Sequence, residues 1–143
     1  MNLKNYINMK TRFIDKIIIH CADTRVDQDF TSKDIDRWHK ERGWSEIGYH
    51  YVILLDGTIE KGRDINKMGA HCKGYNKTSI GVCFMGGKKA DNSEWDKPTK
   101  EQIKSFKKLD VELSKKYPNI TIHGHYEYSS KSCPNFDVCK LYE

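Results

Sequence analysis

Runs of β-branched and other apolar residues along the chain predict the strands of a central sheet. The clearest runs are residues 14–20, 49–55, 79–85 and 121–123. Such runs, bounded by polar or glycine-containing segments, are typical of buried strands. The pair Asp56-Gly57 follows the second run and favours a hairpin, with residues 58–60 returning as a further strand.

Apolar residues at helical spacing predict two helices. The first covers about 32–42, preceded by Thr31 as a capping residue. The second begins after Thr99, which can form a capping box with Gln102, and its apolar stripe continues until Pro118. Lysines occupy the other faces of this second helix, which is typical of a solvated surface, so we do not expect nucleic acid as a partner.

The order of these elements predicts the fold class. Strands that alternate with helices indicate an α/β protein, a single domain with a mixed central β-sheet flanked by α-helices. The hairpin at Asp56-Gly57 excludes a wholly parallel sheet. A chain of 143 residues is near the common size of one domain, so we expect residues 1–143 to form one domain, with 1–12 as an N-terminal extension.

Charge and cysteine content bear on the binding partners and the cellular location of the protein, but they do not identify its function. The net charge of +5 favours a polyanionic neighbour, which a cell wall, a nucleic acid or a membrane surface could each provide. Residues 1–12 contain no apolar signal region, and no run approaches the length of a membrane span. We therefore expect a cytoplasmic protein without a signal peptide or membrane partner, whose five cysteines are thiols rather than disulfides.

Three residues have side chains that zinc prefers. His20 ends the first predicted strand, and His125 and Cys133 lie on one late loop. A hydrolytic zinc site uses three protein ligands of this kind and leaves a fourth position for water. The spacing alone is weak support, because the chain has no CxxC or HExxH motif and single histidines or cysteines are more often structural. By the same reasoning we expect His39 to serve packing or to lie on the surface. Side chains alternate along a strand, so we expect His50 to point away from Tyr49, as a core residue or one that supports the site.

Short segments in a common order give the chain a family resemblance. The most specific are Ile19-His20-Cys21, Trp38-His39-Lys40-Glu41, Gly48-Tyr49-His50, Lys73-Gly74-Tyr75-Asn76, Ser79-Ile80-Gly81-Val82-Cys83 and Lys131-Ser132-Cys133-Pro134. With them the chain resembles the N-acetylmuramoyl-L-alanine amidase family of phage lysozymes and peptidoglycan recognition proteins. The resemblance implies a zinc-dependent enzyme that hydrolyses the amide between N-acetylmuramic acid and L-alanine of peptidoglycan.

The resemblance also implies roles for individual residues. It implies one zinc ion per chain, with the ligands His20, His125 and Cys133. Tyr49 and Lys131 match the catalytic tyrosine and lysine. His125 is preferred because it lies eight residues before the cysteine, as in the family, but His123 stays open as an alternative.

Substrate contacts are expected in the glycine-rich segment 62–76, which has no periodicity and is predicted to be a loop. His71 and Asn76 are the candidates, because recognition residues are concentrated on loops. A purely structural role in the loop is an equally open interpretation.

The resemblance suggests partners and a place of action. Peptidoglycan is the expected substrate, and we expect a monomer. Some relatives bind peptidoglycan without cutting it, but these lack the cysteine ligand, so Cys133 favours an enzyme. A phage relative also binds RNA polymerase, but no sequence motif identifies a polymerase-binding surface in this chain. The absent signal favours a prophage endolysin released through a holin, or an effector delivered by a secretion system.

Overall fold

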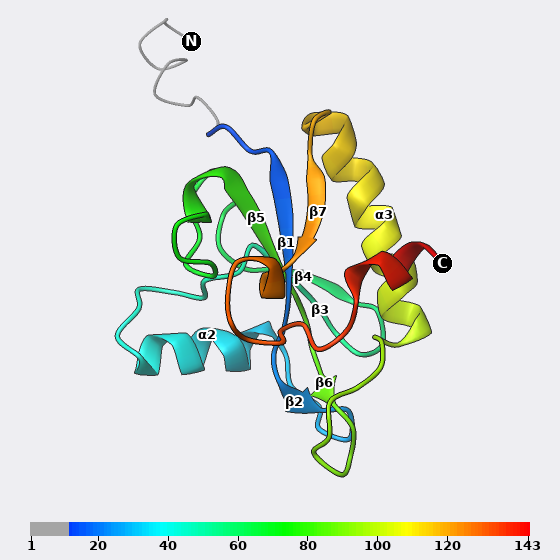
Figure 1. Cartoon of the computed structure of the whole chain (residues 1–143). Coiled ribbons are helices and arrows are strands. Elements are labelled where there is room, and N and C mark those ends of the chain that lie inside the picture. The colour runs from blue at the N-terminus through cyan, green and yellow to red at the C-terminus, as the bar shows by residue number, and fades with distance from the viewer. Residues whose placement is uncertain (1–11) are drawn as a thin grey trace, which may run out of the picture.

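The computed structural model describes residues 12–143 and has a mixed sheet at its centre (Figure 1). The strands of this sheet are β1 (Lys16–Cys21), β3 (Tyr51–Ile53), β4 (Ile59–Lys61), β5 (Ser79–Phe84) and β7 (Thr121–Gly124). Their order is β4-β3-β5-β1-β7. Only the β3–β4 pair is antiparallel, and the other pairs are parallel. The predicted α/β fold with a mixed sheet is confirmed.

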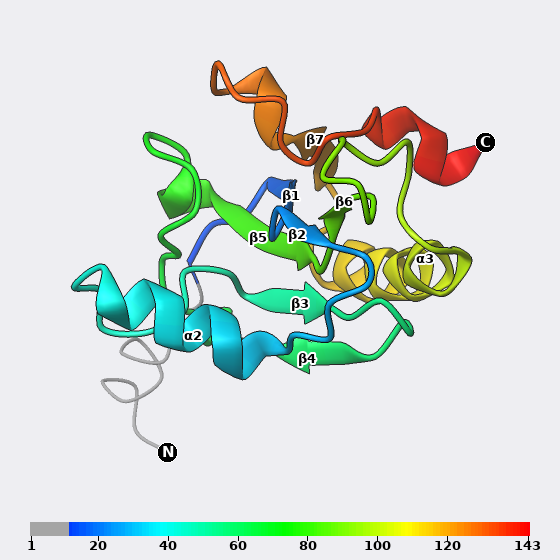
Figure 2. The same ribbon diagram turned by 90° about the horizontal axis from the view of Figure 1, so that it is seen from below.

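Each face of the sheet is covered by one helix, α2 (Ser32–Glu41) or α3 (Lys100–Lys116), as Figures 1 and 2 show. Residues of α3, including Phe106, form a core with Ile17 and Ile19 of β1. On the opposite face Ile35 of α2 packs in a second cluster with Val52 of β3. Successive strand residues point to opposite faces, so the two clusters share the strands between them.

Both helices begin where the polar pattern predicts. The Thr31 side chain accepts a hydrogen bond from a backbone amide of the first turn of α2, and the Thr31 amide donates to the side chain of Asp34. Thr99 and Gln102 form the same reciprocal arrangement at α3. Because each box satisfies backbone donors that have no helical partner, it defines the first residue of its helix.

The second predicted strand, 49–55, is shorter than its apolar run. Regular strand geometry covers only Tyr51–Ile53, because the chain turns immediately afterwards. Leu54 accepts from the amide of Gly57 and donates to the carbonyl of Thr58, which leaves a loop of three residues. Gly57 has a φ of +91°, a conformation that glycine adopts without a Cβ penalty, and this explains the position of the glycine.

Several short elements were not predicted. These are the parallel pair β2 (Thr24–Arg25) and β6 (Gly87–Lys88), and the 3-10 turns η1 (Asn76–Thr78), η2 (His125–Glu127) and η3 (Val138–Tyr142). Most of the predicted N-terminal extension, 1–12, lies outside the described residues. Arg12 is described, and its guanidinium donates to the carbonyls of Ile65 and Asn76. No helix among residues 12–143 is long and apolar enough to span a membrane.

A buried glutamine connects α3 to the sheet. The Gln102 side chain is fully buried, and its Nε2 donates to the carbonyls of Ile53, at 3.0 Å, and Met85, at 2.8 Å. Its Oε1 accepts from the Thr99 amide. One side chain therefore connects the first turn of α3 by hydrogen bonds to the ends of β3 and β5.

We expect Gln102→Leu to destabilise the protein by about 2–4 kcal/mol, because it leaves the Met85 carbonyl and the capping amide of Thr99 without partners. The Ile53 carbonyl loses one of its two bonds and keeps the bond from the Met85 amide. Urea unfolding would measure the change. Lys108→Leu, at an exposed position on the same helix, is the matched control and should change stability by less than about 0.5 kcal/mol. Equal stability of the two variants would contradict the role assigned to Gln102.

Candidate functional site

The site is built at the carboxyl ends of two adjacent parallel strands. In β1, Ile17 and Ile19 point into the α3 core, so the alternation of side chains places His20 on the opposite face. The His20 side chain is only 1% exposed. His125 follows β7 directly, at the start of η2. Because β1 and β7 are parallel neighbours, the two histidines meet at the same edge of the sheet, with ring centroids 4.4 Å apart.

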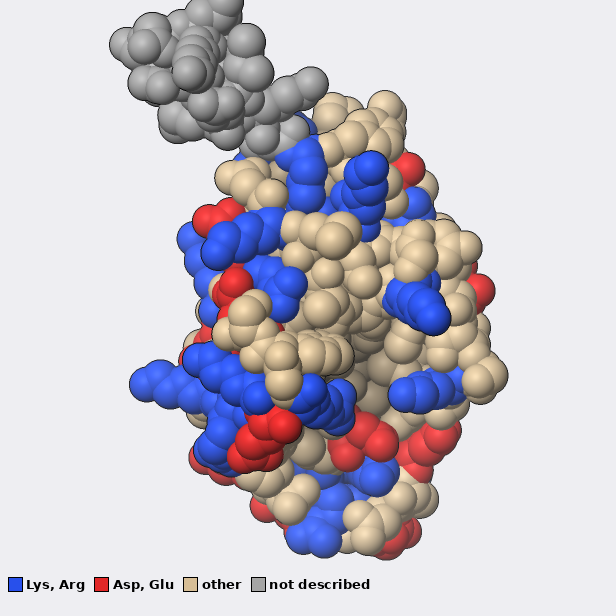
Figure 3. Space-filling model, turned by 90° about the vertical axis from the view of Figure 1, so that its left-hand side faces the viewer, with Lys and Arg blue, Asp and Glu red and all other residues tan. Residues whose placement is uncertain are grey.

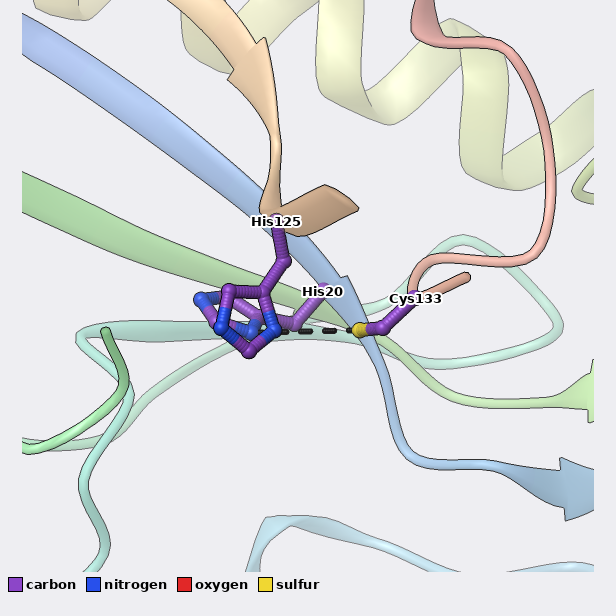
Figure 4. A group of neighbouring side chains, drawn as sticks. All are labelled: His20, His125 and Cys133. Atoms are coloured by element: carbon purple, nitrogen blue, oxygen red, sulfur yellow. Dashed lines mark hydrogen bonds between the residues drawn. The ribbon is translucent and has the colours of Figure 1, made fainter. Parts of the chain in front are cut away.

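Cys133 completes a group of three possible metal ligands (Figure 4). Its Sγ lies 3.9 Å from Nδ1 of His20 and accepts a hydrogen bond from the backbone amide of Cys21. One donor atom from each of His20, His125 and Cys133 lies within 4.8 Å of the others. Tetrahedral zinc separates nitrogen and sulfur ligands by about 3.5 Å, and the 3.9 Å between Sγ of Cys133 and Nδ1 of His20 is close to this distance.

The structure distinguishes the two candidate histidines on β7 and η2. His123 bonds instead to Thr121, with 2.6 Å between Nε2 and Oγ1, and to Glu127, with 3.0 Å between Nδ1 and Oε1. It is not part of the group that contains His20 and Cys133. His125 is therefore the histidine that the fold brings to this group.

The protonation states of this group suit a metal. A hydrogen bond from the Cys21 thiol, with smaller contributions from His125 and His20, lowers the pKa of the Cys133 thiol. Desolvation by burial lowers the pKa of His20. A thiolate and a neutral imidazole are the forms that bind zinc, so neither residue has to lose a proton at neutral pH.

A cleft of about 1180 Å³ opens above the group. Tyr49 and Lys131 both line it, and the Tyr49 ring centroid lies 5.0 Å from that of His20. Desolvation raises the pKa of Tyr49 well above its usual value, so its hydroxyl stays protonated and can donate a hydrogen bond. Lys131 is exposed and forms no ion pair with any residue that the structure describes, which leaves its ammonium group available to a ligand.

The rim of the cleft is predominantly basic. Figure 3 shows a face of the molecule that is hollowed, with lysine and arginine side chains on both sides of the hollow. The lining includes four basic residues and two acidic ones, namely Arg42, Lys73, Lys88, Lys131, Asp23 and Glu94. This excess of positive charge favours an anionic ligand.

The two predicted substrate contacts also line the cleft, but both have structural bonds. The Oδ1 of Asn76 accepts from the amides of His71 and Cys72, at 2.8 Å each. Nδ1 of His71 lies 2.8 Å from Nε2 of His20. Contact with substrate stays a prediction for both residues. The link between His20 and His71 was not predicted, because nothing in the sequence pairs residues 51 positions apart.

The two remaining histidines, His39 and His50, both accept hydrogen bonds from backbone amides. Nδ1 of His39 accepts from the Gly48 amide, and Nδ1 of His50 accepts from the Gly81 amide. Burial is the main cause that lowers the pKa of each of these histidines to about 4. Both side chains are buried, which agrees with the packing role expected for His39 and the core position expected for His50. All five cysteines are free thiols.

Comparisons with known proteins agree with this geometry. Residues 10–136 match the family model described as N-acetylmuramoyl-L-alanine amidase. The endolysin of Escherichia phage T7 is 42% identical over 130 residues, which cover 90% of this chain and 85% of the relative. The solved N-acetylmuramoyl-L-alanine amidase LysC from Clostridium intestinale is 32% identical with a TM-score of 0.78, covering 91% of this chain and 83% of that one.

A second structural relative comes from insects. The structure of Drosophila PGRP-LB is 28% identical with a TM-score of 0.75, and the match covers 87% of this chain and 76% of that one. The family match spans most of the chain and includes the sheet, the cleft and all three possible metal ligands. The chain therefore belongs to the N-acetylmuramoyl-L-alanine amidase family.

Proposed function

We propose that this protein is a zinc-dependent N-acetylmuramoyl-L-alanine amidase that hydrolyses the bond between N-acetylmuramic acid and L-alanine in peptidoglycan. The observation that carries the proposal is the group of His20, His125 and Cys133 at the base of a cleft that is open to solvent. The phage endolysins among the relatives and the amidase family model support the same activity. The chain acts in this proposal as one catalytic domain.

The number and kind of donor atoms match a catalytic zinc site rather than a structural site, in which four protein ligands surround the ion. Two imidazole nitrogens and one thiolate would hold the ion with three protein ligands, the number typical of catalytic zinc sites. When bound there, zinc supplies Lewis-acid activation of a water molecule, whose pKa falls to about 7. A single zinc ion per chain is therefore sufficient for the proposed reaction.

Tyr49 and Lys131 contribute a hydroxyl and an ammonium group, which can donate hydrogen bonds to the reacting amide. Attack on an amide places negative charge on the carbonyl oxygen, and donors aimed at that charge lower the barrier. The ammonium of Lys131 can stabilise this charge from the rim of the cleft. The protonated Tyr49 hydroxyl can donate a hydrogen bond or move a proton during the reaction.

The charge of the cleft suits the proposed substrate. Stem peptides of peptidoglycan carry carboxylates, and the basic lining residues Arg42, Lys73 and Lys88 can attract them. His71 and Asn76 are the proposed substrate contacts on the loop beside the ligand group. The place of action is the bacterial cell wall, which the enzyme reaches after release from the cell that makes it.

The first prediction concerns the bond that is cut. Purified peptidoglycan digested with the protein should gain new L-alanine amino termini while the glycan strands stay intact, measured by mass spectrometry of the fragments. Cys133→Ala should produce no new L-alanine amino termini, because it removes one of the three side chains that would bind the metal. New reducing sugar ends would identify a glycosidase and overturn the proposal.

The second prediction concerns the metal. Elemental analysis should find one zinc ion per chain, and a chelator should abolish wall lysis. A metal-bound thiolate is shielded, so Cys133 should resist alkylation until zinc is removed. Cys139 is exposed and outside the metal group, so it should be labelled at the same rate with and without chelator. Full activity in protein without zinc would exclude the metal mechanism.

The third prediction separates catalysis from metal binding. Tyr49→Phe and Lys131→Ala should keep zinc but lose on the order of 10²- to 10³-fold in lysis rate, as for the loss of one oxyanion donor. Lys131→Arg should recover little, because a guanidinium places its donors differently from an ammonium. Lys140→Ala, an exposed control outside the cleft, should lyse walls at the parent rate. Parent activity in Lys131→Ala would exclude a catalytic role for that lysine.

A further inference from the structure

A chain of hydrogen bonds leads away from His20 on the side opposite the metal group. Nε2 of His20 lies 2.8 Å from Nδ1 of His71. Nε2 of His71 lies 3.2 Å from Oγ of Ser79, which in turn lies 2.7 Å from the carbonyl oxygen of Tyr75. Both ring nitrogens of His71 therefore have partners within the protein.

The carbonyl at the end of this chain determines where each proton lies. A carbonyl oxygen only accepts, so the single hydroxyl proton of Ser79 is donated to Tyr75. Ser79 must then accept from His71, which places the proton of the neutral His71 ring on Nε2. Nδ1 of His71 is left as an acceptor, and Nε2–H of His20 donates to it. In neutral His20 the other nitrogen, Nδ1, then carries no proton.

This unprotonated nitrogen is the one that faces the metal group. Nδ1 of His20 is the atom that lies 3.9 Å from Sγ of Cys133. A metal needs a lone pair at this atom, and the opposite tautomer would present a proton to it. The hydrogen-bond chain and the ligand geometry thus require the same tautomer of His20.

The protein provides a fitted slot for the His71 ring. A Cβ added to Gly81 would lie 2.6 Å from the Cγ and Cδ2 atoms of His71, and one added to Gly69 would lie 2.7 Å from Cδ2. Only residues without a side chain allow the ring to lie this close to the backbone. Asn76 holds the His71 amide at 2.8 Å and so fixes the base of the side chain.

We propose that His71 is a positioning residue that holds His20 in the tautomer with Nδ1 free, and that Ser79 orients His71 for this purpose. The inference rests on the proposed metal site and deepens it. Metal-bound histidines are commonly oriented by a partner on their second nitrogen, and loss of such a partner costs about 10- to 100-fold in metal affinity. His71 would thus affect hydrolysis through His20.

The tautomer can be observed without metal or substrate. Long-range ¹H–¹⁵N NMR of the zinc-free protein, at a pH where His20 is neutral, should show the proton of His20 on Nε2. His71→Asn should preserve this state, because Oδ1 of asparagine is the same number of bonds from Cα as Nδ1 of histidine. His71→Gln carries its amide one bond further along, and His71→Leu has no acceptor, so both should show a mixture of tautomers.

Zinc affinity gives the second readout, measured with zinc alone by competition against a chromophoric chelator. We expect His71→Leu and His71→Gln to bind zinc about 10- to 100-fold more weakly, and His71→Asn to stay within a few-fold of the parent. Ser79→Ala, which keeps the imidazole, should show a smaller loss in the same direction. Thermal unfolding of each zinc-free variant would identify any that fail to fold.

The inference is overturned if His20 carries its proton on Nδ1 in the parent protein, or if His71→Leu leaves the tautomer and the zinc affinity unchanged. Equal weakening in His71→Asn, His71→Gln and His71→Leu would also overturn it, because that pattern reports packing rather than a hydrogen-bond acceptor. If the parent binds no zinc yet keeps the proton on Nε2, the proposed metal function fails while the assignment of the tautomer stands.

Discussion

Parallel neighbours on both sides hold β1 in place, and the site is assembled around this strand. β5 and β7 bond to its two edges, and Ile17, Ile18 and Ile19 are fully buried. A strand held in this way cannot slip by one residue without exchanging its two faces. The register therefore places His20 near the carboxyl end of β1, on the face of the sheet opposite the α3 core. The ligands from later segments are arranged around this one residue.

Hydrogen bonds to the core hold the loop that brings Cys133 to His20. The amide of Tyr126 donates to the carbonyl of Cys133, and Nε1 of the buried Trp95 donates to the carbonyl of Pro134. Nδ2 of Asn135 donates to the carbonyl of Gly87. These contacts come from segments far apart in sequence, so the position of the thiol is defined although its own segment has little regular structure.

The interior of the site and its rim have different electrostatic characters, and each suits its task. Burial lowers the pKa of His20, His39, His50 and His71, so the interior consists of neutral imidazoles with assigned hydrogen-bond partners. Neutral rings can bind a metal or accept a backbone amide, whereas buried imidazolium ions would cost desolvation energy. The lysines and arginines stay at the rim, where water solvates them and an anionic substrate can meet them.

Helices, strands and turns that depend on local interactions could be predicted from the sequence. The capping residue Thr31, the capping box at Thr99, the glycine of the hairpin and the apolar strand runs predict the α/β fold, because each depends on neighbouring residues. The family resemblance also identified the residues that the structure brings together as His20, His125 and Cys133. The sequence preferred His125 but left His123 open, and the folded structure was needed to place His123 outside the group. The folded structure was also needed to find the bonds of His71 to His20 and Ser79. These relations join residues far apart in the chain, and their distances and proton positions depend on packing that no local pattern encodes.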